Sequence, residues 1–335
     1  MQILVTGGNG FIGSHLSERL LEADNHVTVV DDLSTGRRSN LNRVIDHPRL
    51  RTIHADLGDP VLIREVCKEV DVVYHLAAAV GVALIAKHPI QTIHRNIFPT
   101  QLLLDELRRI HLTGRRVSMF LASTSEVYGK NPKSIWCESD DLVFGATTKP
   151  RWSYGASKAI DEFLALACVR ECNMKIVIGR FFNVSGPRQS GAYGMVLPRF
   201  VEAAMAGKPL VVHDDGMQER CFAHVSDVVG AVMTLMNTES NYGRIYNIGA
   251  DQAISILEMA KRVVAIVNPS ATIQFQAYSQ AYDEDFEDIR RRVPDLGRIR
   301  QAINYAPTLF LDEIIRDVWR EMLEQTSANH SQPDA

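Results

Sequence analysis

The chain has 335 residues, of which 46% are hydrophobic, and a formal net charge of −4. This length can bury one large core and a smaller lobe, and the acidic balance argues against a nucleic-acid surface. No apolar run reaches the roughly 18 residues that span a bilayer. The first predicted strand starts at residue 2, which leaves no room for a signal peptide, and five scattered cysteines indicate reduced thiols without a metal site. We therefore expect a cytoplasmic protein that binds no metal and no membrane.

The first strand is predicted over residues 2–6, and the glycine-rich segment GGNGFIG follows it at residues 7–13. A helix is predicted from Ser14 onwards. Glycines in this pattern let the chain turn sharply, approach a phosphate and pack the helix on the strand. The first amides of the helix would then face the pyrophosphate of a dinucleotide. The residues predicted to hold the cofactor here are Gly7, Gly10, Phe11, Ile12 and Gly13.

The second strand is predicted over residues 26–31 and ends at Asp31. A carboxylate at this point accepts from the 2′-hydroxyl of the adenosine ribose and repels a 2′-phosphate, which favours NAD over NADP. Arg37 and Arg38 lie close by and could attract a 2′-phosphate, but we weigh Asp31 more heavily. Asp31 and the adjoining Asp32 are therefore predicted to bind NAD.

Later strands are predicted over 51–55, 71–76, 117–122 and 175–181, and they alternate with helical segments. Such alternation predicts an α/β fold with a parallel sheet covered by helices on both faces. Ligands bind at the carboxyl ends of the strands in such sheets. The hydroxyl-rich segment at residues 122–129 follows one of these strands and would meet the substrate.

Tyr154 and Lys158 lie four residues apart, on one face of a predicted helix. A free tyrosine has a pKa of about 10. A neighbouring ammonium and a positive nicotinamide ring favour its phenolate. With Thr124, the pair could take a proton from a sugar hydroxyl while hydride leaves the same carbon for NAD.

Together these motifs resemble the extended short-chain dehydrogenase/reductase family, in its nucleotide-sugar epimerase/dehydratase branch. The resemblance runs from residue 1 to about residue 319. Besides the glycine loop and the Thr/Tyr/Lys set, the segments that carry it are Asp56-Leu57, 75–78, 180–187, 220–225, 247–249 and 292–295.

The resemblance implies an NAD-binding Rossmann fold, a doubly wound parallel sheet, with a smaller C-terminal substrate-binding lobe. Residues 1–182 would form the Rossmann domain, and 223–250 would return to it. The nucleotide-sugar lobe would comprise 183–222 and 251–324. The polar residues 325–335 are predicted to form a disordered tail.

The resemblance also implies a UDP-linked nucleotide-sugar substrate and a homodimer that pairs the helices near 91–111 and 154–172, although the sequence alone equally allows both helices to be buried within one chain. Thr124 would hydrogen-bond the sugar's 4-hydroxyl. The residues that would flank the adenine and line the cofactor channel are Asp56, Leu57, Ala77 and Ala78. Those that would hold the diphosphate are Asn183, Arg220 and Arg292, and guanidinium forks suit that role. The candidates for binding a C6 carboxylate are Ser123, Ser125, Arg188 and Arg220.

Enzymes of this branch begin by oxidising the sugar at C4. A 4-epimerase needs only the Thr/Tyr/Lys set, whereas a 4,6-dehydratase or a uronate decarboxylase must also manage a proton at C5, which suits a carboxylic acid. Glu126 lies two residues after Thr124, so both side chains would point the same way in an extended segment. The alternative is that Glu126 faces solvent or caps a helix.

The pair Ser125-Glu126 resembles UDP-glucuronate decarboxylases, where 4,6-dehydratases typically carry Asp-Glu. The segments 149–154 and 282–288 resemble the same decarboxylases. Oxidation at C4 makes a glucuronate a β-keto acid that loses carbon dioxide, and Glu126 or a water it orients would protonate C5. The product would be UDP-xylose or a UDP-4-keto-pentose.

Residues 189–198 instead resemble sequences grouped with UDP-glucose 4-epimerases. We therefore place a UDP-glucuronate decarboxylase ahead of a UDP-glucose or UDP-glucuronate 4-epimerase, and a 4,6-dehydratase behind both. A non-enzymatic NAD sensor is disfavoured because the catalytic set Thr124, Tyr154 and Lys158 is intact.

Overall fold

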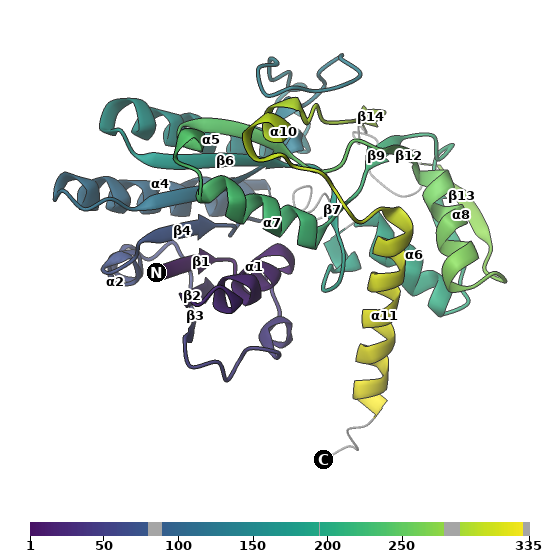
Figure 1. Ribbon diagram of the computed structural model, residues 1–335. Helices are drawn as coiled ribbons and strands as arrows, with labels where there is room; N and C mark the ends of the chain where they lie inside the picture. The colour runs from purple at the N-terminus through teal and green to yellow at the C-terminus, as the bar shows by residue number, and fades with distance from the viewer. Residues whose placement is uncertain (80–88, 194, 278–288, 331–335) are drawn as a thin grey trace.

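The computed structural model describes residues 1–79, 89–193, 195–277 and 289–330 (Figure 1). Its centre is a seven-stranded sheet in the order β11-β6-β5-β4-β1-β2-β3, in which every neighbouring pair is parallel. The strands are β1 (Gln2–Thr6), β2 (His26–Asp31), β3 (Leu50–His54), β4 (Val72–His75), β5 (Ser118–Thr124), β6 (Lys175–Phe181) and β11 (Arg244–Ile248). This sheet confirms the predicted Rossmann-type α/β fold, with the strand returning at 244–248 beside β6.

Helices cover both faces of the sheet because successive strand residues point to opposite sides. Ile3 and Val5 pack into one core with α1 (Phe11–Glu22) and α7 (Val225–Met236). Leu4, between them, packs into the other core with α2 (Pro60–Cys67), α4 (Pro89–Leu112) and α5 (Trp152–Cys172). The near-continuous apolar strands are thus buried on both faces, as parallel sheets require.

A third apolar core lies in the C-terminal part of the chain. The helices around it are α6 (Val196–Met205), α8 (Ile256–Val267) and α11 (Leu311–His330), and the strand pair beside them is β8 (Leu210–His213) with β13 (Ile273–Gln276). A three-stranded sheet adjoins it, made of β12 (Ala253–Ser255), β9 (Glu219–Cys221) and β14 (Arg291–Arg292). Other short elements include β7 (Val184–Ser185), β10 (Ala223–His224) and α10 (Gly297–Ile303).

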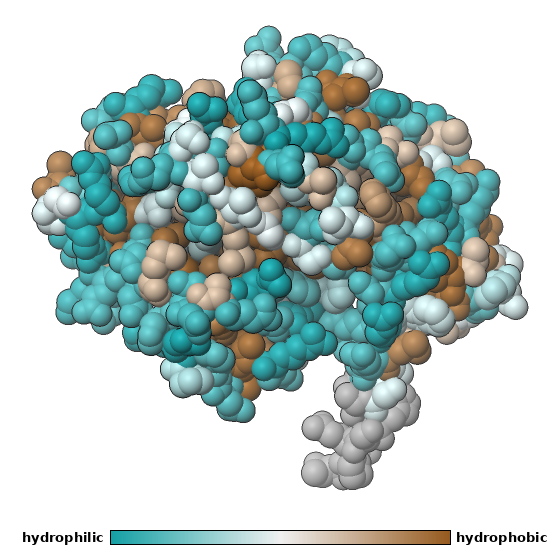
Figure 2. Space-filling model, viewed as in Figure 1, coloured by the Kyte–Doolittle hydropathy of each residue, from teal (hydrophilic) through white to brown (hydrophobic). Residues whose placement is uncertain are grey.

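The polar tail differs from its prediction, because α11 continues through His330 and the chain is helical where disorder was expected from residue 325. The hydroxyls of Thr326 and Ser327 donate to carbonyls one turn earlier, which extends the helix beyond its apolar contacts. The last five residues lie outside the described part. Figure 2 shows hydrophilic residues over most of the visible face, with hydrophobic residues scattered among them.

A buried ion pair fixes α5 against the sheet. The guanidinium of Arg180, on β6, donates to both carboxylate oxygens of Glu162, with N–O distances of 2.9 and 2.7 Å. The hydroxyl of Ser123, on β5, donates to the same carboxylate at 2.5 Å. Both charged side chains are almost fully buried. One carboxylate on α5 is therefore tied to two neighbouring strands.

Replacing Glu162 by Gln should destabilise the fold, because Arg180 would keep its buried charge without a counter-charge. Breaking a buried pair in this way typically costs about 3–5 kcal/mol of unfolding free energy. Urea denaturation of the wild type and Glu162→Gln measures the loss. The exposed pair of Arg108 and Asp105 provides the control, since Arg108→Ala should change stability far less. Equal effects of the two substitutions would contradict the assignment.

Candidate active site

The loop after β1 has no room for side chains at two of its glycines. Gly7 has a φ of +69°, and a Cβ there would lie 2.8 Å from the amide nitrogen of Ala77. A Cβ on Gly13 would lie 2.2 Å from the carbonyl oxygen of Gly7. The loop therefore runs tight against the start of α1, whose N-cap is Gly10 and whose first turn begins with Phe11 and Ile12. The free first amides of α1 fit the pyrophosphate of NAD.

Asp31 ends β2 as a buried carboxylate. Its two oxygens accept from the backbone amides of Asn9, at 2.9 Å, and Leu33, at 2.8 Å. Burial raises the pKa of Asp31, and these two hydrogen bonds oppose that rise. Each oxygen keeps a lone pair that suits a ribose hydroxyl. The neighbouring Asp32 lies 3.5 Å from a guanidinium nitrogen of Arg95 on α4, so it is an ion-paired carboxylate.

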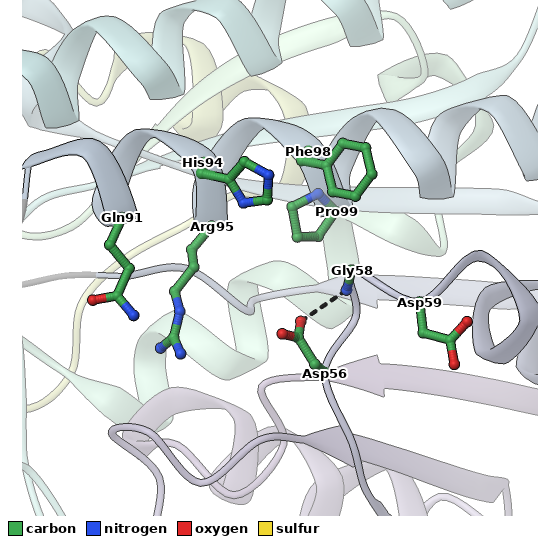
Figure 3. Close-up of a pocket in the computed structure, with 8 residues that line it drawn as sticks. All are labelled: Asp56, Gly58, Asp59, Gln91, His94, Arg95, Phe98 and Pro99. Carbon is green, nitrogen blue, oxygen red and sulfur yellow. Dashed lines mark hydrogen bonds between the residues drawn. The ribbon is translucent and has the colours of Figure 1, made fainter.

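A pocket lies beside these carboxylates, between α4 and the loop after β3 (Figure 3). Figure 3 shows Gln91 and Arg95 extending from α4 toward the loop that carries Asp56. The rings of His94 and Phe98 stack with centroids 5.1 Å apart. The full lining is Asp56, Gly58, Asp59, Gln91, His94, Arg95, Phe98 and Pro99. Sequence motifs missed the α4 contribution, because a helix residue carries no local sign that it faces a loop some forty residues earlier.

The other residues predicted to contact the cofactor lie along the same edge of the sheet. Leu57 follows β3 and is buried. Ala77 and Ala78 follow β4 and are half-buried, and the amide of Ala77 donates to the hydroxyl of Thr6 at 3.3 Å. The chain thus lines the carboxyl ends of β1 to β4, where the strand order reverses and Rossmann folds bind dinucleotides.

Thr124, Tyr154 and Lys158 lie together at the adjoining end of β5. Thr124 is the last residue of β5, and Tyr154 lies in the first turn of α5. The hydroxyl of Thr124 acts on the Tyr154 phenol and favours its ionised form. Burial raises the pKa of Tyr154, the charge of Glu126 raises it further, and the Thr124 hydroxyl opposes the rise. Lys158 is one helical turn beyond Tyr154, and its ammonium lies 2.7 Å from a carboxylate oxygen of Asp161.

Glu126 lies in the 3₁₀ turn η2 (Ser125–Tyr128) between two guanidinium groups. One of its oxygens lies 2.5 Å from Arg292, and the other lies 3.6 Å from Arg151. Burial alone would raise the pKa of Glu126, but Arg292 and Arg151 outweigh burial, and the net pKa is lowered. Arg292 also reaches the hydroxyl of Ser125 at 3.5 Å. Glu126 is thus an ionised carboxylate inside the site, and the solvent-facing alternative does not apply.

The remaining predicted substrate residues divide into two groups. Arg220 is buried and its charge acts on Glu126, so it belongs to the same region. Asn183 donates to the carbonyl of Cys221 at 3.1 Å and so joins the loop after β6 to β9. Ser123 and Arg188 make other contacts.

Ser123 and Arg188 contact other protein side chains, whereas they were expected to bind the substrate. Ser123 bonds to Glu162, because alternation along β5 points it away from the side that Thr124 faces. Arg188 forms a 2.7 Å ion pair with Glu18 on α1. The segment 189–198, which resembles 4-epimerases, lies partly outside the described residues. The segment 282–288, which resembles decarboxylases, lies wholly outside them.

Nothing in the described part of the chain groups three His, Cys, Asp or Glu side chains as a metal site would require. None of the helices in that part is long and apolar enough to cross a membrane.

Comparison with known proteins agrees with this architecture. The family model described as "NAD dependent epimerase/dehydratase family" matches residues 3–249. A UDP-N-acetyl-alpha-D-glucosaminuronate decarboxylase from Bacillus cytotoxicus is 36% identical, over 94% of this chain and 95% of its own. UDP-glucuronic acid decarboxylase 3 from Arabidopsis thaliana is 34% identical, over 93% of this chain and 86% of its own.

A solved structure extends the likeness to the whole fold. It is the UDP-glucuronic acid 4-epimerase from Bacillus cereus in complex with UDP-glucuronic acid and NAD, which is 28% identical with a TM-score of 0.86. The match covers 97% of this chain and 100% of that one. The tight glycine loop after β1 of this chain fits NAD, the cofactor named in that complex. The chain therefore belongs to the NAD-dependent epimerase/dehydratase family of enzymes and uses NAD as its cofactor.

Proposed function

We propose that this enzyme oxidises a UDP-linked hexuronate at C4 and removes its C6 carboxylate as carbon dioxide. The observation that carries the proposal is the charge around Glu126. This half-buried carboxylate lies beside Thr124, and the guanidinium groups of Arg292, Arg151 and Arg220 act on it. Guanidinium groups gathered in this way suit an acidic sugar, because they bind carboxylates through charge-assisted hydrogen bonds.

In the proposed first step, Tyr154 takes the proton of the C4 hydroxyl while Thr124 holds that oxygen. NAD, when bound, supplies the acceptor for the hydride that leaves C4. The positive charge of Lys158 favours the phenolate that Tyr154 needs to act as a base. The favourable effect of the Thr124 hydroxyl on the Tyr154 phenolate supports this arrangement.

In the proposed second step, the C4 ketone makes the sugar a β-keto acid. Arg292 orients the C6 carboxylate, the C5–C6 bond breaks, and its electron pair passes to the C4 oxygen as carbon dioxide leaves. Protonated Tyr154 hydrogen-bonds to that oxygen. Since Glu126 is ionised, we propose that it orients the water that protonates C5, rather than donating its own proton. This assigns Arg292 to the sugar, whereas the family resemblance implied that it holds the diphosphate.

The names of the relatives support a decarboxylase. They name two different sugars as candidates for the substrate. One relative is named for UDP-N-acetyl-glucosaminuronate and the other for UDP-glucuronic acid. The two substrates share the C6 carboxylate and differ at C2. The proposed chemistry at C4, C5 and C6 is the same for both, so we propose the shared class, a UDP-hexuronate.

A 4-epimerase is the second candidate, and the structural match to the UDP-glucuronic acid 4-epimerase favours it. That reaction needs the same base and the same C4 oxidation. It differs in keeping C6 and returning hydride to the other face of C4.

We also propose that the enzyme is a homodimer paired through α4 and α5. These helices pack side by side and leave large apolar side chains exposed. Phe163 is 64% exposed and Ile160, one turn before it on α5, is 44% exposed. Ile93 on α4 is also exposed. A second copy would bury both helices against their own equivalents, as isologous dimers do.

Incubation of the protein and NAD with UDP-glucuronate carrying ¹³C at C6 should move the label into bicarbonate. The nucleotide product should be a UDP-pentose or its 4-ketone, and NMR identifies both. The 2-acetamido analogue, run in parallel, identifies the preferred sugar. Retention of the label in a galacto-configured product would reject the decarboxylase and make the protein a 4-epimerase.

The variants Glu126→Gln and Tyr154→Phe should stop the reaction at different points. Tyr154→Phe should abolish C4 oxidation, seen as absent reduced-cofactor absorbance, while NAD still binds. Glu126→Gln should keep C4 oxidation but slow product formation by about 10²-fold or more, because C5 protonation loses its oriented water. Single-turnover absorbance and NMR separate the two steps. Full-rate product from Glu126→Gln would exclude the role proposed for Glu126.

Replacing Phe163 by Glu should convert the dimer to a monomer, since the charge would be buried without a partner in the interface. Analytical ultracentrifugation measures the mass. Leu323→Glu is the matched control, because Leu323 is also an exposed apolar residue but lies on α11. A monomeric wild type, or a dimeric Phe163→Glu, would refute the α4–α5 interface.

A further inference from the structure

We infer that Asp161 is a positioning residue for the reaction. It holds the ammonium of Lys158 and offsets its charge, so that Lys158 stabilises the Tyr154 phenolate less than an unpaired ammonium would. Asp161 belongs to no motif used above. The inference rests on the proposed role of Tyr154 as the base, but it does not depend on which sugar is the substrate.

Three side chains on one face of α5 form the arrangement. Lys158 follows Tyr154 by four residues and precedes Asp161 by three, and both spacings bring helical side chains together. The ammonium nitrogen of Lys158 lies 2.7 Å from a carboxylate oxygen of Asp161. The side chains are 2% and 0% exposed. A phenol, an ammonium and a carboxylate thus follow one another along the helix, the phenol half-buried and the two charged groups shielded from water.

Because Lys158 and Asp161 are buried, their charges can affect the protonation of the neighbouring Tyr154. Salt and water screen exposed charges, whereas buried charges act across several ångströms with little screening. Burial is the largest influence on the pKa of Tyr154 and raises it, and the charge of Asp161 raises it further. Removing the carboxylate while keeping the ammonium would therefore favour the phenolate.

The other polar groups around the pair do not replace Asp161. His75, on β4, lies between the hydroxyls of Thr6 and Thr100, at 2.7 and 3.0 Å. Burial, followed by the charge of Lys158, lowers the pKa of His75 to about 3, so the ring is neutral at working pH. Glu162, the next carboxylate on α5, is already paired with Arg180. The counter-charge to Lys158 therefore comes from Asp161.

The charged and hydroxyl groups that face Tyr154 come from four elements. Glu126 on η2 and Asp161 on α5 raise its pKa, whereas Thr124 at the end of β5 and Arg292 on β14 lower it. Burial raises the pKa of Asp161 itself, and Lys158 and Thr100 oppose that rise. In the pH range where Asp161 is ionised, its carboxylate is one of the two negative charges that raise the pKa of Tyr154.

Asp161→Asn keeps the shape of the side chain and removes its charge. The rate of C4 oxidation rises with pH as Tyr154 loses its proton. A lowered pKa of Tyr154 should move this acid limb to lower pH by about one unit, within the usual size of a neighbouring-charge effect. The pH profile of kcat/KM for C4 oxidation measures the shift. Asp161→Glu, which restores the charge, should return the limb toward that of the wild type.

A purely structural ion pair would give a different result. Asp161→Asn would then lower the unfolding temperature and leave the acid limb in place. An unmoved limb, or a limb moved to higher pH, overturns the inference. If the Asn variant does not fold, Asp161→Ser is the second variant, because it leaves room for a water to accept from Lys158 without restoring the charge. The same shift is expected of it.

A substrate-free measurement separates this inference from the proposed function. The near-ultraviolet absorbance of the Tyr154 phenolate can be titrated in NAD-loaded protein as the difference between each variant and its Tyr154→Phe counterpart. Asp161→Asn should titrate at lower pH than the wild type. If no UDP-sugar is turned over, the proposed function fails, yet an unshifted titration would still reject the role of Asp161 and a shifted one would support it.

Discussion

The ion pair between Arg180 and Glu162 is the contact on which the geometry of the proposed catalytic residues depends. Tyr154 and Lys158 both lie on α5, so their position over the sheet is set by whatever fixes that helix. A purely apolar contact between helix and sheet could slide by part of a turn. The forked bond from β6, with the hydroxyl of Ser123 from β5, allows one register because three donors meet one carboxylate.

The same physical rule, that buried charges need partners, organises the rest of the site. Glu126 is paired with Arg292 and Arg151 on one side of Tyr154, and Lys158 is paired with Asp161 on the other. Charges from both sets of ion pairs act on the pKa of Tyr154. The protonation of Tyr154 therefore depends on the charges near Glu126 and on the charge of Asp161. Binding of an anionic sugar near Glu126 would add a negative charge and change the pKa of Tyr154.

Short sequence patterns predicted the features of the structure that depend on residues close together in the chain. The strands, the glycine loop and the spacing of Tyr154 and Lys158 depend on neighbours within a few residues, and the structure contains the six predicted strands with bounds shifted by at most about two residues. The bonds from Glu126 to Arg292 and from Asp32 to Arg95 join distant parts of the chain, and no local pattern encodes such partners. Ser123 was misjudged because a hydroxyl beside Thr124 looked functional, although strand alternation turns it toward Glu162.

The branch between decarboxylation and epimerisation depends on groups beyond C4, because C4 oxidation is common to both. An epimerase must keep the C5 proton and leave the ketone free to turn. A decarboxylase must hold the C6 carboxylate until its bond breaks and then bring a proton to C5. A glutamate whose pKa two guanidinium groups lower is a poor source of that proton, but it can hold a water and share its cations with a second carboxylate. The arrangement around Glu126 thus suits the loss of C6 better than its retention.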